Sequence, residues 1–184
     1  DKQTGKGVWK IDQVISSWAM PVVGKTEAGS QELIVSQLKQ VRGFDPDTGK
    51  QLWRCDGVKN YVVATPLVHD GIVYCNGGLT KQTMAIKLGG RGDVTATHKL
   101  WEIPKGANVS APVIHDGKLF LILDNGILQV FDIADGKMLK RHRLPTKSRM
   151  YSSPVLADGL LYINLEDSGL YVCQADVNAK KVAH

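Results

Sequence analysis

The stretch FDPDTGKQLW, Phe44 to Trp53, predicts two short strands joined by a tight turn. An apolar strand end meets Asp45, the turn reads Asp-Thr-Gly-Lys, and a second strand closes on Trp53. Related stretches follow the same outline, and they are TGKGVW at 4–9, FDIADGKMLK at 131–140 and a distorted KLW that ends at Trp101. This recurrence indicates a repeated structural unit.

A second motif alternates with the first and consists of a small residue, a proline and two apolar residues. Its prolines are Pro21, Pro66, Pro112 and Pro154. They stand 45, 46 and 42 residues apart, and they account for four of the seven prolines in the chain. Such regular spacing predicts a repeat array with a period of about 44 residues.

Each repeat contains four short apolar stretches separated by turn signals. Between the first two stretches lie the dipeptides Asp70-Gly71, Asp116-Gly117 and Asp158-Gly159, and Asp-Gly favours a type I′ hairpin turn. No window shows helical periodicity. Four antiparallel strands in each unit of about 40 residues are typical of a β-propeller blade.

The sequence therefore predicts an all-β chain, 1–184, that forms a single propeller segment of about four four-stranded antiparallel blades. We expect a lone outer strand at 1–11 and blades at 19–54, 64–102, 110–141 and 152–184. The favoured arrangement is part of a seven- or eight-bladed ring; two copies that complete an eight-bladed ring and a closed four-bladed ring are the alternatives.

Composition limits the function classes. The 184 residues are 43% hydrophobic and 22% charged, which is typical of a soluble globular protein. The net charge of +5 is spread over turns, so we expect no nucleic-acid binding. No run of 18 apolar residues predicts a membrane span. The three cysteines lack CxxC spacing, which indicates neither a zinc site nor a disulfide framework.

The recurring residues have structural interpretations. Trp9, Trp53 and Trp101 are expected to fill the space between blades, and Asp45 and Asp132 to accept backbone N–H groups of their turns. His69 and His115 occupy equivalent places on different blades, so we expect no metal site there. The sequence contains neither a Gly-x-Ser-x-Gly elbow nor a glycine-rich phosphate loop before a helix. We predict no catalytic residue.

The pattern Asp-x-x-Thr-Gly-Lys-x-x-Trp, followed by Ser/Ala-x-Pro-Val-Val and Asp-Gly-x-x-Tyr, resembles the pyrroloquinoline quinone (PQQ) enzyme repeat family over essentially the whole chain. This family includes quinoprotein alcohol dehydrogenases and cofactor-free relatives, such as the outer-membrane assembly lipoprotein and bacterial sensor ectodomains. The enzymes are expected to hold the quinone with a Trp and adjacent cysteines, beside a calcium ion. Because this sequence has no adjacent cysteines and no recognisable calcium ligands, the resemblance implies the cofactor-free branch and a periplasmic or extracellular location.

Propellers bind partners through the loops between blades, and the loop before the last blade is the most basic of them. We predict binding of a protein or peptide, with an acidic surface, by the basic segment Arg141, His142, Arg143, Lys147, Arg149 and Tyr151. Self-association to complete a ring is also expected, because an open array exposes apolar blade faces. The alternative function is that of a fragment of a PQQ-dependent alcohol or sugar dehydrogenase.

Overall fold

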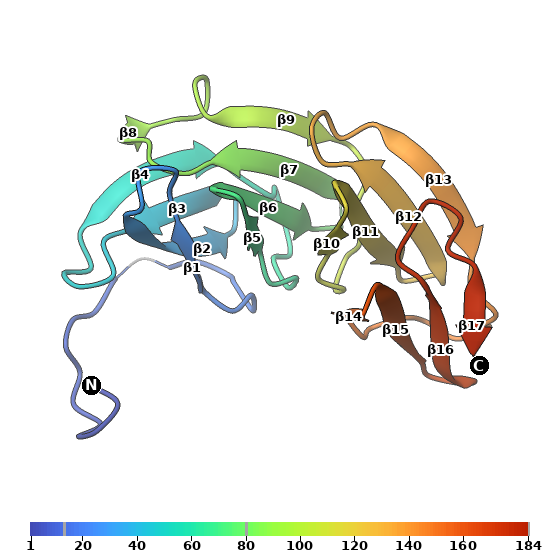
Figure 1. Cartoon of the computed structure of the whole chain (residues 1–184). Helices are drawn as coiled ribbons and strands as arrows, with labels where there is room; N and C mark the ends of the chain where they lie inside the picture. The colour runs from blue at the N-terminus through green and yellow to red at the C-terminus, as the bar shows by residue number, and fades with distance from the viewer. Residues whose placement is uncertain (13, 80, 184) are drawn as a thin grey trace.

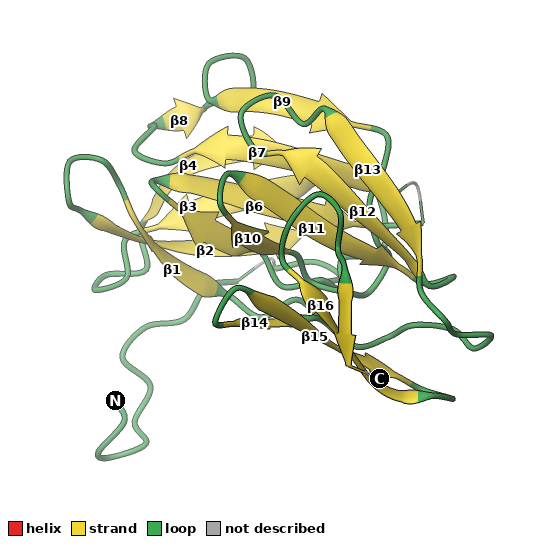
Figure 2. Ribbon diagram, turned by 45° about the vertical axis from the view of Figure 1, so that its right-hand side comes forward, coloured by secondary structure: helices red, strands yellow, loops and turns green. Residues whose placement is uncertain are grey.

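A computed structural model describes residues 1–12, 14–79 and 81–183, and all regular elements in these ranges are β-strands (Figures 1 and 2). No helix that could cross a membrane is present in the described ranges. The strands form four sheets arranged side by side along an open arc (Figure 1). The predicted all-β fold, a partial β-propeller with one sheet in each blade, is confirmed.

The four blades follow one another along the chain, and each contains four consecutive main strands. The first contains β1 (Val22–Lys25), β2 (Gln31–Gln37), β3 (Gln40–Phe44) and β4 (Gln51–Asp56). The second contains β5 (Leu67–His69), β6 (Ile72–Gly77), β7 (Gln82–Lys87) and β9 (Lys99–Ile103). The third contains β10 (Val113–His115), β11 (Lys118–Leu123), β12 (Ile127–Asp132) and β13 (Met138–Arg143). The fourth contains β14 (Val155–Ala157), β15 (Leu160–Leu165), β16 (Gly169–Gln174) and β17 (Lys181–Ala183).

Each blade is an antiparallel meander, in which successive strands are ordered from the inside of the arc to the outside. The first strands, β1, β5, β10 and β14, lie on the concave side, and the last strands lie on the convex side (Figure 1). The four repeated prolines stand immediately before these inner strands, where a residue without an N–H group removes no ladder hydrogen bond.

Apolar side chains pack between neighbouring blades because alternate residues of a strand point to opposite faces of its sheet. Between the first two blades, Ile34 belongs to the same buried cluster as Val73. Tyr74, which follows Val73 in β6, belongs instead to the cluster shared with Leu119 of the third blade. Phe120 then packs in the cluster that faces the fourth blade. Consecutive residues of one strand therefore hold the blades on its two sides.

The Asp-Gly turns have the backbone conformation that their sequence predicts. Asp70 and Gly71 have φ values of 47° and 72°, and the other two pairs are similar. A type I′ turn requires positive φ at both central residues, and Asp and Gly tolerate it best. The prediction of tight hairpins between the first two strands of these blades is thus confirmed.

The longer loop of the second blade forms an additional contact. Between β7 and β9 it contains β8 (Gly92–Asp93), which pairs in parallel with β4 of the first blade. Val94 then donates its N–H to the carbonyl of Arg54 at 2.9 Å, and the Arg54 guanidinium lies 3.0 Å from the Asp93 carboxylate. The insertion therefore covers the outer edge of the first blade.

At two positions a tryptophan contacts the turn of the following blade. The Trp9 indole donates to the carbonyl of Pro46 at 3.0 Å, and the Trp101 indole to that of Ile133 at 2.9 Å. Each ring lies so close to a turn glycine, Gly49 or Gly136, that a Cβ atom there would meet it. Both carbonyls belong to the residue after the turn aspartate, so the contact is the same in the two repeats.

Trp53 occupies a different environment. It is fully buried, and its ring lies against Gly43 on the neighbouring strand, where no side chain would fit. Its indole donates to the buried carboxylate of Glu32 at 2.7 Å. Glu32 also accepts from Gly89 N at 3.3 Å and from the Arg91 guanidinium at 3.0 Å, both in the loop of the second blade. One buried carboxylate thus links the first two blades.

The expected outer strand at 1–11 is wrong as secondary structure. Residues 1–12 are described but contain no strand. An outer strand forms by pairing with the third strand of its blade, and no described strand pairs with this segment. Only Trp9 keeps the expected contact with the following blade.

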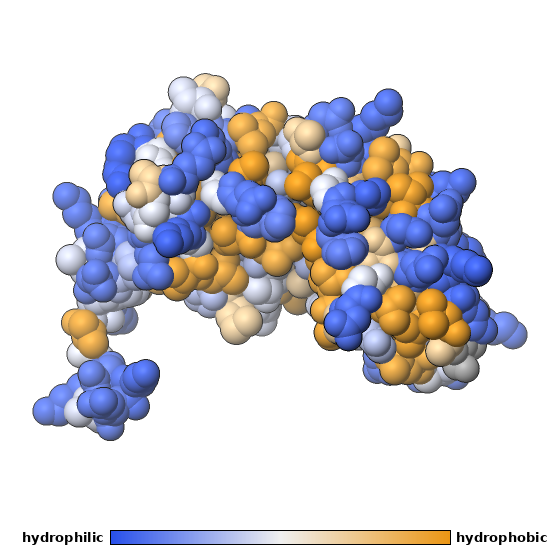
Figure 3. Space-filling model, in the orientation of Figure 1, coloured by the Kyte–Doolittle hydropathy of each residue, from blue (hydrophilic) through white to orange (hydrophobic). Residues whose placement is uncertain are grey.

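The end of the arc exposes apolar side chains. Val155, Leu170 and Val182 of the last blade are each more than half exposed, and Figure 3 shows a hydrophobic surface over this blade. The first and last blades lie at opposite ends of the arc in Figure 1. In this structure the four blades do not form the closed ring that was one of the alternatives.

We expect Trp53→Ala to lower the free energy of unfolding by about 3–5 kcal/mol, because it removes a large buried ring and leaves Glu32 without one of its donors. Denaturant melts measure this loss. Lys140→Ala is the control: Lys140 occupies the corresponding repeat position but is exposed, so the change should stay within about 0.5 kcal/mol. A loss below about 1 kcal/mol for Trp53→Ala would contradict its packing role.

Candidate binding surface

The connections between blades lie beside the turns that join the second and third strands. In the first blade, Lys39 N donates to the carbonyl of Val58 at 2.7 Å. In the second blade, Gly78 N donates to the carbonyl of Tyr61 at 3.0 Å. Both carbonyls belong to the connection between these two blades. Connections and turns therefore form one rim at this end of the strands.

The connection between the third and fourth blades is fixed to the same kind of turn at two points. Leu144 N donates to the carbonyl of Gly126 at 2.9 Å, and Met150 N donates to that of Asp124 at 2.8 Å. The Leu144 and Met150 side chains are both buried in the core between the blades. The exposed residues between these two anchors therefore have a fixed base.

Asp167, in the turn between β15 and β16, holds this connection from the other side. Its carboxylate accepts from the Thr146 hydroxyl at 2.7 Å, from Lys147 N at 2.8 Å and from Ser148 N at 3.1 Å. These hydrogen bonds hold the pKa of the Asp167 carboxyl well below its usual range, and the bond from the Thr146 hydroxyl makes the largest contribution. We call residues 144–150 with Asp167 the clamped connection.

The structure divides the predicted basic segment into two parts. Arg141, His142 and Arg143 lie on β13, whereas the other three residues lie in or next to the clamped connection. The Arg143 guanidinium donates to the carbonyl of Asn125. A ring nitrogen of His142, Nε2, lies 2.8 Å from the carbonyl of Val177 in the last blade. His142 therefore takes part in blade packing, and three of the six residues lie on β13 rather than on the loop.

Lys147, Arg149 and Tyr151 are exposed on the connection itself. Arg149 and Tyr151 line a hollow of about 210 Å³, together with Ser152, Asn164 and Glu166. The Ser152 hydroxyl donates to the carbonyl of Asn164 at 2.8 Å, which fixes the connection to β15. A cation and an aromatic ring beside amide and carboxylate groups can bind both polar and apolar atoms of a peptide.

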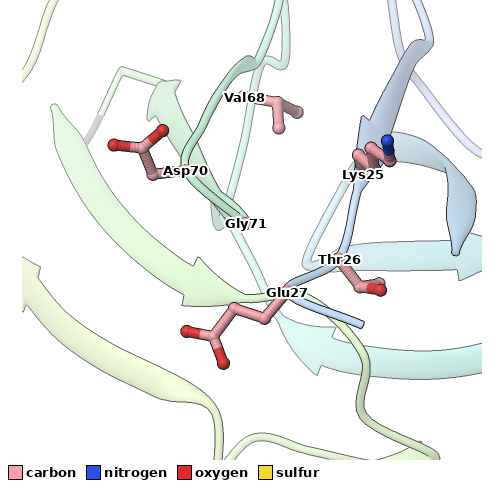
Figure 4. Close-up of a pocket in the computed structure, with 6 residues that line it drawn as sticks. All are labelled: Lys25, Thr26, Glu27, Val68, Asp70 and Gly71. Atoms are coloured by element: carbon pink, nitrogen blue, oxygen red, sulfur yellow. The ribbon is translucent and has the colours of Figure 1, made fainter. Parts of the chain in front are cut away.

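A larger hollow, of about 520 Å³, lies between hairpin turns of the first two blades (Figure 4). It is lined by Lys25, Thr26, Glu27, Val68, Asp70 and Gly71. Glu27 forms an ion pair with Lys87 at 2.9 Å, and Figure 4 shows Lys25 and Asp70 on opposite sides of the hollow. These charged groups do not converge on one point as catalytic or metal-binding groups do.

The chemically reactive side chains are separated or buried. No group of three or more His, Cys, Asp or Glu residues that could hold a metal ion occurs in the described part of the chain. Cys55, Cys75 and Cys173 are free and buried. Burial raises the pKa of Cys75 to about 12 and that of Cys173 to about 11, so these thiols are protonated at neutral pH.

The repeated aspartates lie within their own turns. The Asp45 carboxylate accepts from Thr48 N at 2.9 Å and from Asp47 N at 3.0 Å. The Thr48 N–H makes the largest contribution to the lowered pKa of Asp45. Asp132 accepts from Ala134 N at 2.8 Å. Both side chains form turn contacts on separate blades.

Residue-by-residue interpretation of the sequence missed Asp167 and two exposed aromatic residues, Trp18 and Tyr61. The signal for Trp18 lies in the repeat: it stands three residues before Pro21, as Tyr151 stands before Pro154. Tyr61 has no such equivalent. The role of Asp167 depends on a contact with a connection about 20 residues earlier in the chain, which no local motif indicates.

Fold and surface together define a β-propeller built from repeated four-stranded blades, with a rim of inter-blade connections. Residues 1–91 match the family model described as "Outer membrane protein assembly factor BamB". This match assigns residues 1–91 to the PQQ-repeat β-propeller family, and the same four-stranded blade architecture continues through the rest of the described chain. No curated protein matches the sequence.

Solved structures show the same fold at low sequence identity. BamB from Moraxella catarrhalis is 14% identical with a TM-score of 0.64, over 90% of this chain and 49% of its own. Quinohemoprotein alcohol dehydrogenase from Comamonas testosteroni is 14% identical with a TM-score of 0.65, over 92% and 35%. The computationally designed protein Ika4 is 15% identical with a TM-score of 0.65, over 90% and 99%. The chain thus spans about half the length of that BamB and about a third of that dehydrogenase.

We expect Asp167→Ala to release the clamped connection, because three hydrogen bonds from the connection are accepted by the Asp167 carboxylate. The Lys147 and Ser148 amides should then exchange with solvent at least about ten-fold faster, as measured by hydrogen-exchange NMR. Because the folded pKa of Asp167 is lowered, its stabilising effect is complete above the unfolded value of about 3.9 and is lost as the pH falls through the lower folded value.

Glu166→Ala is the matched control, since no hydrogen bond joins the Glu166 side chain to this connection among the described residues. Unchanged exchange in Asp167→Ala, or an equal acceleration in Glu166→Ala, would contradict the assigned clamp.

Proposed function

We propose that this chain is a non-catalytic scaffold that binds a protein or peptide partner through the connections between its blades. The observation that carries the proposal is the clamped connection. It presents Arg149 and Tyr151 above a hollow on a backbone already fixed by Asp167 and by the turn of the third blade. A fixed backbone loses little entropy on binding, and Arg and Tyr are enriched at protein interfaces.

The state of the ionisable side chains supports binding rather than catalysis. Two carboxylates with lowered pKa values, Asp45 and Asp167, already accept several hydrogen bonds within the protein. Such groups hold a proton poorly near neutral pH, which makes them unsuited to general acid–base work. The protonated, buried thiols are equally unsuited to nucleophilic attack.

The family supports the class of partner. BamB, whose description names it an outer membrane protein assembly factor, resembles the first half of this chain. By analogy we infer a protein partner and an exported protein, periplasmic or extracellular. An acidic partner surface fits the net charge of +5 and the exposed Lys147 and Arg149.

The second candidate function is that of a fragment of a PQQ-dependent alcohol or sugar dehydrogenase. The fold match to the Comamonas testosteroni enzyme favours it. Against it stand the cysteines, which lie in different strands and far apart in sequence, whereas the resemblance implies adjacent cysteines at the quinone.

We expect immobilised protein to select peptides from a phage-displayed library of random dodecapeptides. Lys147→Glu/Arg149→Glu should weaken a class of these peptides by about ten-fold or more, because it reverses two charges on the presented surface. Lys2→Glu/Lys6→Glu, which makes the same change of charge in the exposed N-terminal segment, is the control and should bind as before. The absence of any selected peptide would contradict the binding function.

The same preparation tests the competing function. After reconstitution with calcium and pyrroloquinoline quinone, we expect no dye-linked oxidation of alcohols or sugars above the protein-free rate. Turnover by the pure protein would overturn the non-catalytic proposal.

We also propose that copies of the chain associate through the apolar face of the last blade, where Val155, Leu170 and Val182 are exposed. Light scattering at micromolar concentration should then give a mass above the 20.1 kDa of one chain. Leu170→Lys should shift the mass toward the monomer, because it places a charge in the apolar contact. A monomer of 20.1 kDa at all concentrations would contradict self-association.

A further inference from the structure

An exposed apolar patch lies on the rim of connections near the first two blades. It consists of Trp18, Met20, Tyr61 and Leu79, which are 64%, 65%, 50% and 64% exposed. The Trp18 and Tyr61 rings contact each other, with centroids 5.1 Å apart and an angle of 30° between their planes. Leu79 is adjacent, since its N–H donates to the Asn60 side chain at 2.9 Å. We call these four residues the aromatic patch.

The backbone beneath the patch is fixed. Trp18 N donates to the carbonyl of Val62 at 2.8 Å, which joins the two connections that carry the aromatic rings. The Ser17 hydroxyl donates to the carbonyl of Ser36 in β2 at 2.7 Å. Trp and Tyr on a fixed backbone offer a large contact area at low entropic cost, which is why they dominate binding energy at interfaces.

Tyr61 is held in a conformation that bulky residues rarely adopt. Its φ is 54°, in the left-handed region. Its carbonyl accepts from Gly78 N at 3.0 Å, and Gly78 has no space for a Cβ atom beside Asn60. Backbone strain that the surroundings maintain is concentrated at binding sites. Here the strain accompanies a tyrosine ring that lies half exposed beside Trp18.

The surroundings of the patch are basic. The described segments that form this part of the rim, 14–20, 38–39, 57–62, 77–79 and residue 81, contain Lys39, Lys59 and Lys81 but no Asp or Glu. Lys39 and Lys59 line a hollow of about 360 Å³ next to it, where Asp56 is the carboxylate. Lys39 and Lys81 form no ion pair within the described ranges. The rim therefore favours a negatively charged partner.

We propose that the aromatic patch binds an acidic linear segment of a partner protein, in which Leu or Phe side chains stand between Asp and Glu residues. The apolar side chains pack on Trp18, Tyr61 and Leu79, and the carboxylates lie near the three lysines. The inference rests on the proposed function but names a different site from the clamped connection and adds the chemistry of the partner.

The repeat supports a shared role for this face. Trp18 and Tyr151 stand three residues before their repeat prolines and are both exposed, whereas Val63 and Val109 at the same position are only partly exposed. Exposed aromatic residues thus mark the first and the last connection of the array.

The fluorescence of Trp18 provides a direct measurement of peptide binding at the patch. Trp18 is exposed, whereas Trp53 is fully buried and Trp9 and Trp101 are partly covered. Peptides selected from the random dodecapeptide library should be rich in Asp and Glu with Leu or Phe, and their binding should weaken as salt is added. Bound peptide should protect the exposed tryptophan from acrylamide quenching. The same peptides with Asn and Gln in place of their acidic residues should lose this protection.

Two variants of the full chain test the patch. Trp18→Ala and Tyr61→Asn should each weaken, by about ten-fold or more, those selected peptides that protect Trp18 from quenching, and Lys147→Glu/Arg149→Glu should bind the same peptides as before. Asn tolerates positive φ, so Tyr61→Asn should keep or raise the unfolding midpoint while binding is lost. A purely structural tyrosine would instead give a lower midpoint. Leu100→Ala, which shortens an exposed apolar residue on the outer strand β9, is the control and should bind as before.

The outcomes separate the two proposals. If every selected peptide lost affinity in Lys147→Glu/Arg149→Glu and none did in Trp18→Ala or Tyr61→Asn, the patch would be overturned and the proposed function would stay intact. Selected peptides that are not enriched in Asp and Glu would also overturn the proposal for the patch. Self-association that disappears in Trp18→Ala would overturn it too, because a second copy of the chain would then occupy the patch. If no peptide is selected, both proposals fail together.

Discussion

The array depends on one contact, in which a flat ring from the segment before a blade lies against the aspartate turn of that blade. In three places the ring nitrogen contacts the carbonyl of the residue after that aspartate, and the rings are Trp9, Trp101 and His142. The contact combines burial of an aromatic face with one directional hydrogen bond, so it fixes both the distance between blades and their orientation. In the last turn the residue with positive φ is Ala179, three residues after Asp176, whereas Gly49 and Gly136 stand four residues after their aspartates.

The junction between the first two blades reaches the same result by another route. The longer loop of the second blade replaces the short turn, pairs with β4 through β8 and provides two of the donors to Glu32. A buried carboxylate is stable only when its oxygens are hydrogen-bonded. Trp53 donates one of these hydrogen bonds. Its ring therefore packs within the core, whereas the rings of Trp9 and Trp101 lie over a turn.

These contacts leave the rim of connections free to vary. Blade packing uses the faces of the sheets and the turns between their third and fourth strands, whereas the exposed parts of the connections lie beside the turns between second and third strands. Their exposed residues, basic at one end of the arc and aromatic with lysines at the other, therefore carry little of the packing. Function on such a scaffold lies in loops that a rigid framework holds in place.

The sequence by itself determined the repeat, the four-stranded blade and the hairpin turns, because a recurring Pro and an Asp-Gly pair act on the backbone within a few residues. It also located the basic loop before the last blade. It did not show that residues 1–11 lack a strand, that His142 contacts the next turn as Trp9 and Trp101 do, or that Asp167 clamps the connection. Nor did it bring Trp18 together with Tyr61. Only the tertiary structure decided these features, because each joins residues of different blades or connections, and stacking of the sheets alone brings such distant groups into contact.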